Sequence, residues 1–212
     1  MAPLFARVLV LAPALAGLGT LALLALLQGL TEFLPVSSSG HLVLAQAALG
    51  LREPALAIDV ALHGGTLLAV LAVYRADLRS IARDALQGRP RELLLLAVGS
   101  LPAAGVGIGL RSFVEEAFAS PRLAAAGLLA TALILGVGEA GRRRRARAGT
   151  AAAAVPGYAA ALAIGTAQAV AILPGVSRSG STIAAGLLLG LAPPAAARFY
   201  FLRSIPAVAR AA

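Results

Sequence analysis

The sequence predicts an all-α, polytopic membrane protein with two inverted-topology repeats, each containing a broken or re-entrant helix hairpin. Three observations support this fold class. Hydrophobic residues make up 59% of the 212 residues and charged residues only 13%, unlike the usage of soluble domains. The apolar residues form long blocks, several of which approach the roughly 20 residues that a helix needs to cross a bilayer. Finally, one polar motif occurs twice.

The membrane elements are expected to follow the apolar blocks. The first block begins after Arg7 and resembles a secretory signal as far as Leu18, but it continues to Leu30, so a membrane helix is the simpler interpretation. A last apolar run starts near Phe199. The predicted spanning segments are Val8–Leu30, Ala55–Tyr74, Leu93–Leu110, Leu123–Gly138 and Tyr158–Leu173, and the two shorter arms are His41–Leu51 and Ser181–Leu191.

The arginines gather in two connections between the apolar blocks. We interpret residues 75–91 as one basic loop and the segment after Gly141 as another, and the positive-inside rule places both in the cytoplasm. The connection from Arg111 to Arg122 carries Glu115 and Glu116 and is expected outside. The net charge of +9 therefore indicates orientation, and nucleic acid is excluded as a partner because no basic face with interleaved aromatic residues exists. The sequence has no cysteine, which excludes disulfides and thiolate chemistry.

The repeated motif predicts how the chain is organised. Val36–Gly40 reads VSSSG, and Val176–Gly180, at an offset of 140 residues (36 against 176), reads VSRSG. An odd number of crossings, three, separates the copies, so the second copy is expected upside down relative to the first. Polar breaks at membrane depth are tolerated where they line a cavity, so we expect the two breaks to face each other. The prediction is a single membrane domain, 1–212, with repeat 1 at about 18–110 and repeat 2 at about 122–212.

The first break contains a carboxylate in an apolar stretch. Gln28 and Glu32 share one helix face, and an intramembrane ionisable group is by default functional. The serines Ser37, Ser38 and Ser39 fit either helix caps or a reactive site, and the neighbouring Glu32 and His41 favour the site.

The second break supplies a cation. Arg178 is the only basic residue between Arg147 and Arg198, and its guanidinium suits phosphate oxygens. The apolar arm that follows begins at about Ser181, so its free N–H groups and dipole would point at the same place.

Together the breaks predict phosphoryl-transfer chemistry. Glu32 would act as a general base or hold a divalent cation, a serine would attack phosphorus, Arg178 would stabilise charge and His41 would shuttle a proton. The alternative for Arg178 is an ion pair with Glu32 that only fixes the fold. Asp59 and His63 share a helix face and fit the same cavity or a metal site, although a lone pair of this kind is weak support. A membrane carrier or flippase for an anionic or lipid-phosphate substrate is the alternative function, because carriers also use inverted repeats.

At these motifs the sequence resembles the bacterial undecaprenyl-diphosphate phosphatase (bacitracin-resistance) family. The likeness is carried by Gln28–His41 and Pro174–Gly180 and continues through Phe199 to Pro206. It implies removal of the terminal phosphate from undecaprenyl diphosphate, which recycles the lipid carrier for cell-wall synthesis and confers bacitracin resistance.

The resemblance also implies residue roles. Glu32 would be the essential acid and a metal ligand, Ser38 the nucleophile, His41 an assisting group and Arg178 the phosphate clamp. The expected cofactor is Mg²⁺ or Ca²⁺, and the expected partners are a polyprenyl diphosphate, the bilayer and a second copy in a homodimer. The family implies a multi-pass inner-membrane protein whose site opens to the outer, periplasmic face. Its members continue with further helices beyond Pro206, so repeat 2 is expected to be incomplete at Ala212. The expected substrate-binding residues are Gln28, Ser37, Ser39, Ser177, Ser179 and Gly180.

Overall fold

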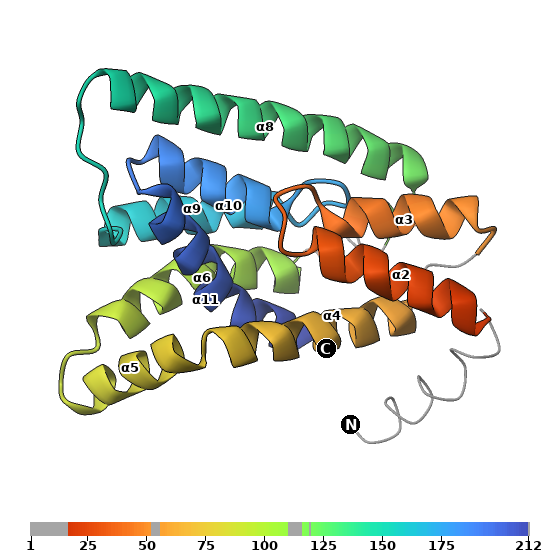
Figure 1. The fold of residues 1–212 in the computed structure, drawn as a ribbon, viewed down its shortest axis with the longest axis horizontal. Helices are drawn as coiled ribbons and strands as arrows, with labels where there is room; N and C mark the ends of the chain where they lie inside the picture. The colour runs from red at the N-terminus through yellow and green to blue at the C-terminus, as the bar shows by residue number, and fades with distance from the viewer. Residues whose placement is uncertain (1–16, 52–55, 110–115, 119, 212) are drawn as a thin grey trace.

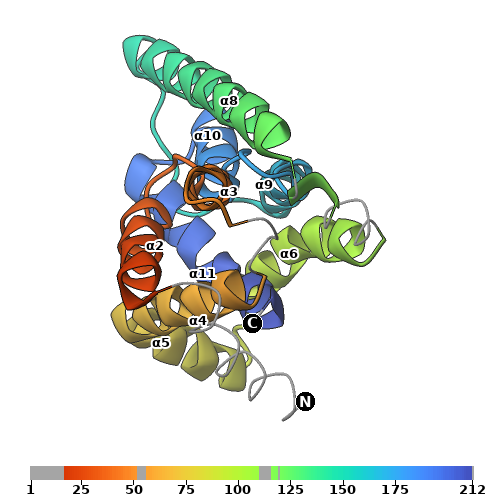
Figure 2. The same cartoon turned by 90° about the vertical axis from the view of Figure 1, so that its right-hand side faces the viewer.

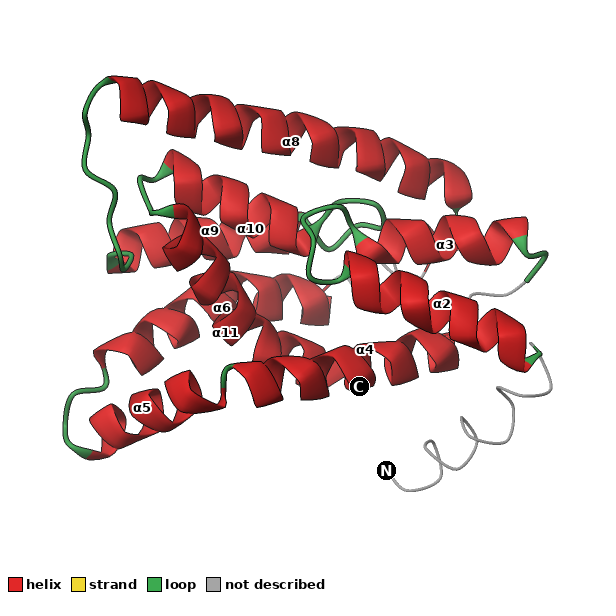
Figure 3. Ribbon diagram, viewed as in Figure 1, coloured by secondary structure: helices red, strands yellow, loops and turns green. Residues whose placement is uncertain are grey.

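The fold is described from a computed structural model that covers residues 17–51, 56–109, 116–118 and 120–211, without the side chains of residues 56, 57, 59, 108 and 207–211. The start of the first predicted helix, residues 8–16, and the segment with Glu115 lie outside these ranges. Within them the regular structure is helical (Figure 3), apart from an isolated β-bridge between Ala153 and Leu191. The predicted all-α class is therefore confirmed.

Nine helices of 11 residues or more are described (Figure 1), and each except α5 overlaps an apolar block that the sequence predicts. The two arms, for example, were expected to begin at His41 and Ser181, and their helices begin three residues earlier in each case. In chain order the helices are α2 (Leu18–Thr31), α3 (Ser38–Ala48), α4 (Leu56–Val73), α5 (Arg75–Leu86), α6 (Arg91–Gly109), α8 (Pro121–Arg147), α9 (Tyr158–Val170), α10 (Arg178–Leu188) and α11 (Pro193–Ala211).

Two helix-break-helix hairpins form the centre of the molecule. The α2/α3 and α9/α10 hairpins extend from a common meeting point toward opposite ends (Figure 1). The helices after the breaks have the same length, 11 residues, and begin 140 positions apart, at residues 38 and 178. Because Pro35 and Pro174 cannot continue a helical hydrogen-bond ladder, each break falls where the sequence predicts it.

Glycines allow the breaks to approach each other closely. A Cβ on Gly40 of α3 would lie 2.7 Å from Gly175 Cα in the second break. Gly175 itself has φ of +83°, a conformation that glycine adopts without steric cost. Gly127 of α8 would also clash with Gly175 if it carried a side chain. The prediction that the breaks face each other is therefore confirmed, and α8 packs behind the second one (Figure 2).

The two arginine-rich connections are more helical than the sequence predicts. Residues 75–86 form the amphipathic helix α5, with Ile81 buried, Asp77 in the first turn and Arg83 in the last, where each charge complements the helix dipole. Helix α8 continues through Arg147. Glu139 stabilises that extension because it accepts hydrogen bonds from Arg142 and Arg143 at 2.6–2.7 Å. Helix α5 and the C-terminal end of α8 lie at the same end of the molecule (Figure 1), as two cytoplasmic segments would.

The lengths of the helices reflect the two breaks. Among the described residues, only α8 is long and apolar enough to cross a bilayer by length and composition. Helices α2 and α9, with 14 and 13 described residues, are apolar but shorter, and each of them ends at one of the two breaks. Large apolar side chains nonetheless cover the outside, which is typical of a surface that contacts lipid or another apolar partner. Among the most exposed are Leu26, Leu68, Leu129 and Leu133.

Helix α11 brings an unexpected cation into the core. Arg203 is 1% exposed and donates to the Gly99 carbonyl of α6 and, at 2.5 Å, to Gln168 Oε1 of α9. Its guanidinium also lies 5.6 Å from the ring centre of Phe199. The sequence places Arg203 in a span expected to be apolar, and the structure shows that it joins three helices instead of facing lipid.

Candidate active site

Both breaks end in the same capping arrangement. Ser37 is the N-cap of α3 and accepts a hydrogen bond from Gly40 N at 3.3 Å, and Ser177 is the N-cap of α10 and accepts one from Gly180 N at 2.9 Å. The capping interpretation of the serines therefore holds for these two. Ser37 has φ of +64°, a strained conformation for a residue with a side chain. The caps aim the free N–H groups and positive dipole ends of α3 and α10 at the same region.

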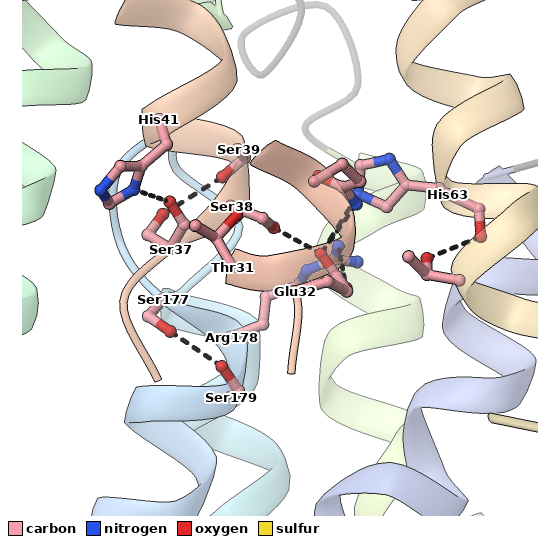
Figure 4. Close-up of polar contacts among 12 residues, drawn as sticks. Thr31, Glu32, Ser37, Ser38, Ser39, His41, His63, Ser177, Arg178 and Ser179 are labelled. Carbon is pink, nitrogen blue, oxygen red and sulfur yellow. Dashed lines mark hydrogen bonds and ion pairs between the residues drawn. The ribbon is translucent and has the colours of Figure 1, made fainter. Parts of the chain in front are cut away.

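Glu32 lies at the centre of the site (Figure 4). Its carboxylate is 8% exposed, accepts a hydrogen bond from Ser38 Oγ and accepts another from Gln28 Nε2 at 3.0 Å. Arg178 Nη2 lies 3.7 Å from Oε1, and His63 Nε2 of α4 lies 3.8 Å from Oε2. A buried carboxylate is tolerated only when it is paired and hydrogen-bonded, and these four groups satisfy it.

The second break is held in place from two sides. Ser179 Oγ donates to the Leu34 carbonyl of the first break at 3.0 Å and lies 3.0 Å from Ser177 Oγ. On the α8 side, Thr131 Oγ1 donates to the Gly175 carbonyl and accepts from Ser177 N, both at 2.8 Å. Arg178 is 29% exposed, so its guanidinium keeps an accessible face beside Glu32.

A small polar pocket forms where the breaks meet. It contains most of the residues that the sequence predicted for the site, from both copies of the motif. Hydroxyl donors, one guanidinium and two helix N-termini suit an anionic group such as a phosphate. The residues that line it, which we call the polar pocket, are Glu32, Ser37, Ser38, Ser39, Ser177, Arg178, Ser179 and Tyr200.

The two histidines occupy different positions. His41 Nδ1 donates to the Ser37 carbonyl at 2.8 Å, and its ring lies on the far side of the serines from Glu32 (Figure 4). The imidazole beside Glu32 belongs to His63. The sequence signal for His63 was its helical spacing from Asp59, whose side chain lies outside the described residues. Tyr200 had no such signal, because it lies inside an apolar run 22 residues after Arg178 (178 against 200).

The oxygen donors fit a divalent cation only in part. Among the described side chains that line the polar pocket, Glu32 is the one carboxylate, and no group of three or more His, Cys, Asp or Glu residues with metal-ligand geometry occurs within the described ranges. Gln28 adds a buried acceptor, since its Oε1 has no hydrogen-bond partner. Mg²⁺ and Ca²⁺ take six or more oxygen ligands, so substrate phosphates and water would have to complete the shell.

Comparison with known proteins agrees with the resemblance seen in the motifs. A family model described as bacitracin resistance protein BacA matches residues 21–212. An undecaprenyl-diphosphatase of Desulfosudis oleivorans is 48% identical over 204 residues, which cover 87% of this chain and 72% of that protein. Similar proteins of the same name occur in Rubrobacter xylanophilus (45% identical, 89% and 72% covered) and Nitrosococcus oceani (43% identical, 87% and 71% covered). The chain therefore belongs to the BacA family of bacitracin resistance proteins.

Proposed function

We propose that this chain is an undecaprenyl-diphosphatase, which hydrolyses undecaprenyl diphosphate to undecaprenyl phosphate and inorganic phosphate. The reaction recycles the lipid carrier for cell-wall synthesis and confers bacitracin resistance. The observation that carries the proposal is the hydrogen bond from Ser38 to Glu32 with Arg178 on the other carboxylate oxygen. A hydroxyl, a base and a phosphate-binding cation thus meet at one point.

In the proposed mechanism Ser38 is the nucleophile. Its Oγ forms a bond to the terminal phosphorus as its proton passes to Glu32. The phosphoanhydride bond breaks, and undecaprenyl phosphate leaves. Glu32 passes its proton to the leaving phosphate and is ionised again. Water then attacks the phosphoserine and gives a proton to Glu32, the bond between Ser38 Oγ and phosphorus breaks, Ser38 recovers its proton from Glu32, and inorganic phosphate is released. Arg178 and the N-termini of α3 and α10 stabilise the charge on the phosphoryl oxygens.

The remaining site residues bind and position. Ser39 and Ser179 line the pocket beside the phosphate oxygens. Ser37 and Ser177 hold the break conformations, because they accept hydrogen bonds from the Gly40 and Gly180 N–H groups, respectively. His41 assists from α3 by fixing the Ser37 carbonyl. Gln28 orients Glu32 through its amide nitrogen.

A divalent cation, Mg²⁺ or Ca²⁺, is part of the proposal. The ligands of this cation would be Glu32, Gln28 Oε1 and oxygens of the diphosphate. The cation would neutralise part of the phosphate charge. Because Arg178 and His63 already face Glu32, the protein on its own should bind such a cation weakly.

We further propose a multi-pass arrangement in the inner membrane with two inverted repeats and re-entrant hairpins. The equal hairpins with opposite directions support it, as does the shared end of α5 and α8, which would face the cytoplasm. The polar pocket would then open to the periplasmic face. Homodimerisation remains a prediction of the resemblance.

Release of inorganic phosphate tests the proposed function. Purified protein in detergent is given a polyprenyl diphosphate with Mg²⁺ or EDTA, and wild type is compared with Glu32→Ala, Ser38→Ala and Arg178→Ala. The proposal predicts turnover by wild type and its loss in all three variants. A folded wild-type protein that binds the lipid without releasing phosphate would instead favour the carrier function.

A further inference from the structure

A second pocket lies against the polar one and is lined mainly by apolar side chains. It is formed by the first break, α4 and α11, and it is shallow and open: the empty space of about 250 Å³ includes the space outside its mouth. We call it the apolar hollow. Its lining residues are Glu32, Phe33, Thr66, Leu67, Val70, Tyr200, Phe201 and Ser204.

The two pockets share Glu32 and Tyr200. The backbone itself joins them at this point, because Glu32 faces the serines and the next residue, Phe33, lines the apolar hollow. A molecule with a charged head in the polar pocket would therefore have its adjoining atoms at the entrance of the apolar hollow.

Tyr200 has the two-sided chemistry that such a junction requires. It is 4% exposed, and it is one of the two side chains that line both the polar pocket and the apolar hollow. Its ring lies on the apolar side, with its centre 5.0 Å from that of Phe201. An aromatic body with a polar tip suits a boundary between apolar and polar surroundings.

Aromatic rings form one wall of the apolar hollow. Phe201 lies 6.0 Å from Phe33 and 5.6 Å from Tyr74, measured between ring centres. Leu67 and Val70 of α4 complete the opposite side. Such a lining favours a hydrocarbon group over water or a second phosphate.

We propose that the apolar hollow seats the first isoprene units of the lipid chain, with Tyr200 at the junction between the chain and the diphosphate. This inference rests on the proposed function and adds the site that recognises the chain. Contacts with a non-reacting part of a substrate position its reactive end. Filling the apolar hollow should therefore lower kcat/KM for prenyl diphosphates, although no group that touches phosphorus has changed.

Photo-crosslinking tests the location directly. The probe is a non-hydrolysable prenyl methylenebisphosphonate with a diazirine on its first isoprene unit, added to the full chain in detergent, and the adducts are mapped by mass spectrometry. We expect adducts on α4 and α11, at Leu67, Val70 or Phe201, and their competition by unlabelled polyprenyl diphosphate.

Neighbouring leucines of α4 provide a matched pair of variants. Leu67 lines the apolar hollow, whereas Leu68 is 68% exposed on the outside of the helix. Leu67→Trp should lower the labelling by about tenfold or more, which corresponds to at least 1.4 kcal/mol of binding free energy. Leu68→Trp should leave the labelling within about twofold of wild type. Equal melting temperatures would show that both variants fold.

The outcomes separate this inference from the proposed function. Labelling of the apolar hollow without phosphate release from the natural substrate would support the chain site and overturn the enzyme. Phosphate release with adducts confined to the outer, lipid-facing surface would keep the enzyme and overturn the chain site. The chain site would also be overturned if neither the unlabelled competitor nor Leu67→Trp lowered the labelling.

Discussion

At the scale of single residues, the structure distinguishes serines that the sequence leaves equivalent. Ser38 Oγ donates to Glu32, whereas Ser39 Oγ lies 3.3 Å from Ser37 Oγ. We expect Ser38→Ala to lower kcat by about 10⁴-fold or more, because the variant loses the attacking nucleophile. Ser39→Ala, the comparison, should change kcat by less than about tenfold, because Ser39 does not bond to Glu32 and any loss of phosphate binding would appear in KM. Phosphate release at saturating prenyl diphosphate measures both.

The converse ranking would contradict the proposed nucleophile. If Ser39→Ala lost activity and Ser38→Ala kept it, attack by Ser38 would be excluded. If Ser38→Ala retained a slow reaction that still depended on Glu32, direct attack by water would replace the phosphoserine step.

Tyr200 makes a second prediction at this scale. Tyr200→Phe keeps the ring but removes the hydroxyl from the junction of the two pockets. We expect kcat/KM for a prenyl diphosphate to fall by about tenfold or more, since a hydrogen bond from this hydroxyl to the charged diphosphate would contribute roughly 1.5–3 kcal/mol. The comparison is Tyr158→Phe, at an N-terminal position of α9 that is 48% exposed, for which no change is expected. Equal kcat/KM in the two variants would remove Tyr200 from the substrate site.

Sequence reasoning reached most of the residues of the polar pocket because they lie in two contiguous motifs. It was weakest for the site residues that come from helices distant in the sequence and reach the site only through tertiary packing. His63 and Tyr200 come from α4 and α11, and no local pattern tells which face of an apolar helix meets the breaks. His41, in contrast, is one turn from Ser38 in sequence, but its ring turns back to the Ser37 carbonyl.

At the scale of elements, the second break depends on a neighbouring helix. Thr131 of α8 bonds both the Gly175 carbonyl and Ser177 N, so it holds the break that presents Arg178. Thr131→Val keeps the shape but leaves two buried backbone groups without partners, at about 1–3 kcal/mol each. We expect a lower melting temperature and a higher KM.

A similar substitution elsewhere separates the support of the break from the general cost of the change. Thr166 of α9 is exposed and bonds only the Leu162 carbonyl of its own helix. Thr166→Val should leave melting temperature and KM close to those of wild type. If both variants behaved alike, Thr131 would have no special role in holding the break.

Element boundaries were predictable where apolar periodicity or proline defines them, and less so where arginines dominate. The helices after the breaks, α3 and α10, begin three residues before their predicted positions, because Pro35 and Pro174 interrupt the chain just ahead of them. The basic segment 75–91 was expected as a loop but contains α5, since arginine is a good helix former and Ile81 finds a buried contact. Charge density therefore did not predict the backbone conformation, and the side of the membrane on which these segments lie stays a prediction.

At the scale of the whole molecule, Arg203 joins α11 to α6 and α9 through Gly99 and Gln168. Arg203→Ala would remove both of these hydrogen bonds and open a cavity, so we expect a loss of about 2–5 kcal/mol of stability. The measurement is the melting temperature in detergent, with Arg122→Ala at the exposed start of α8 as the control. A melting temperature unchanged by Arg203→Ala would mean that the packing of α11 does not depend on this cation.

The opposed hairpins make a prediction for the topology of the entire chain. Helix α5 and the segment after α8 lie at one end, and the C-terminal end of α3 lies at the other (Figure 1). The natural sequence has no cysteine, so single substitutions at exposed positions give an unambiguous label. In sealed inverted membrane vesicles, whose cytoplasmic face is outside, an impermeant maleimide should label Ser80→Cys and Thr150→Cys but not Ala48→Cys, and in intact spheroplasts the pattern should reverse. Labelling of all three cysteines from the same side of the membrane would contradict the inverted repeats, even if the helices pack as described. The two hairpins would then open to the same aqueous phase, whereas inverted repeats require them to open to opposite sides.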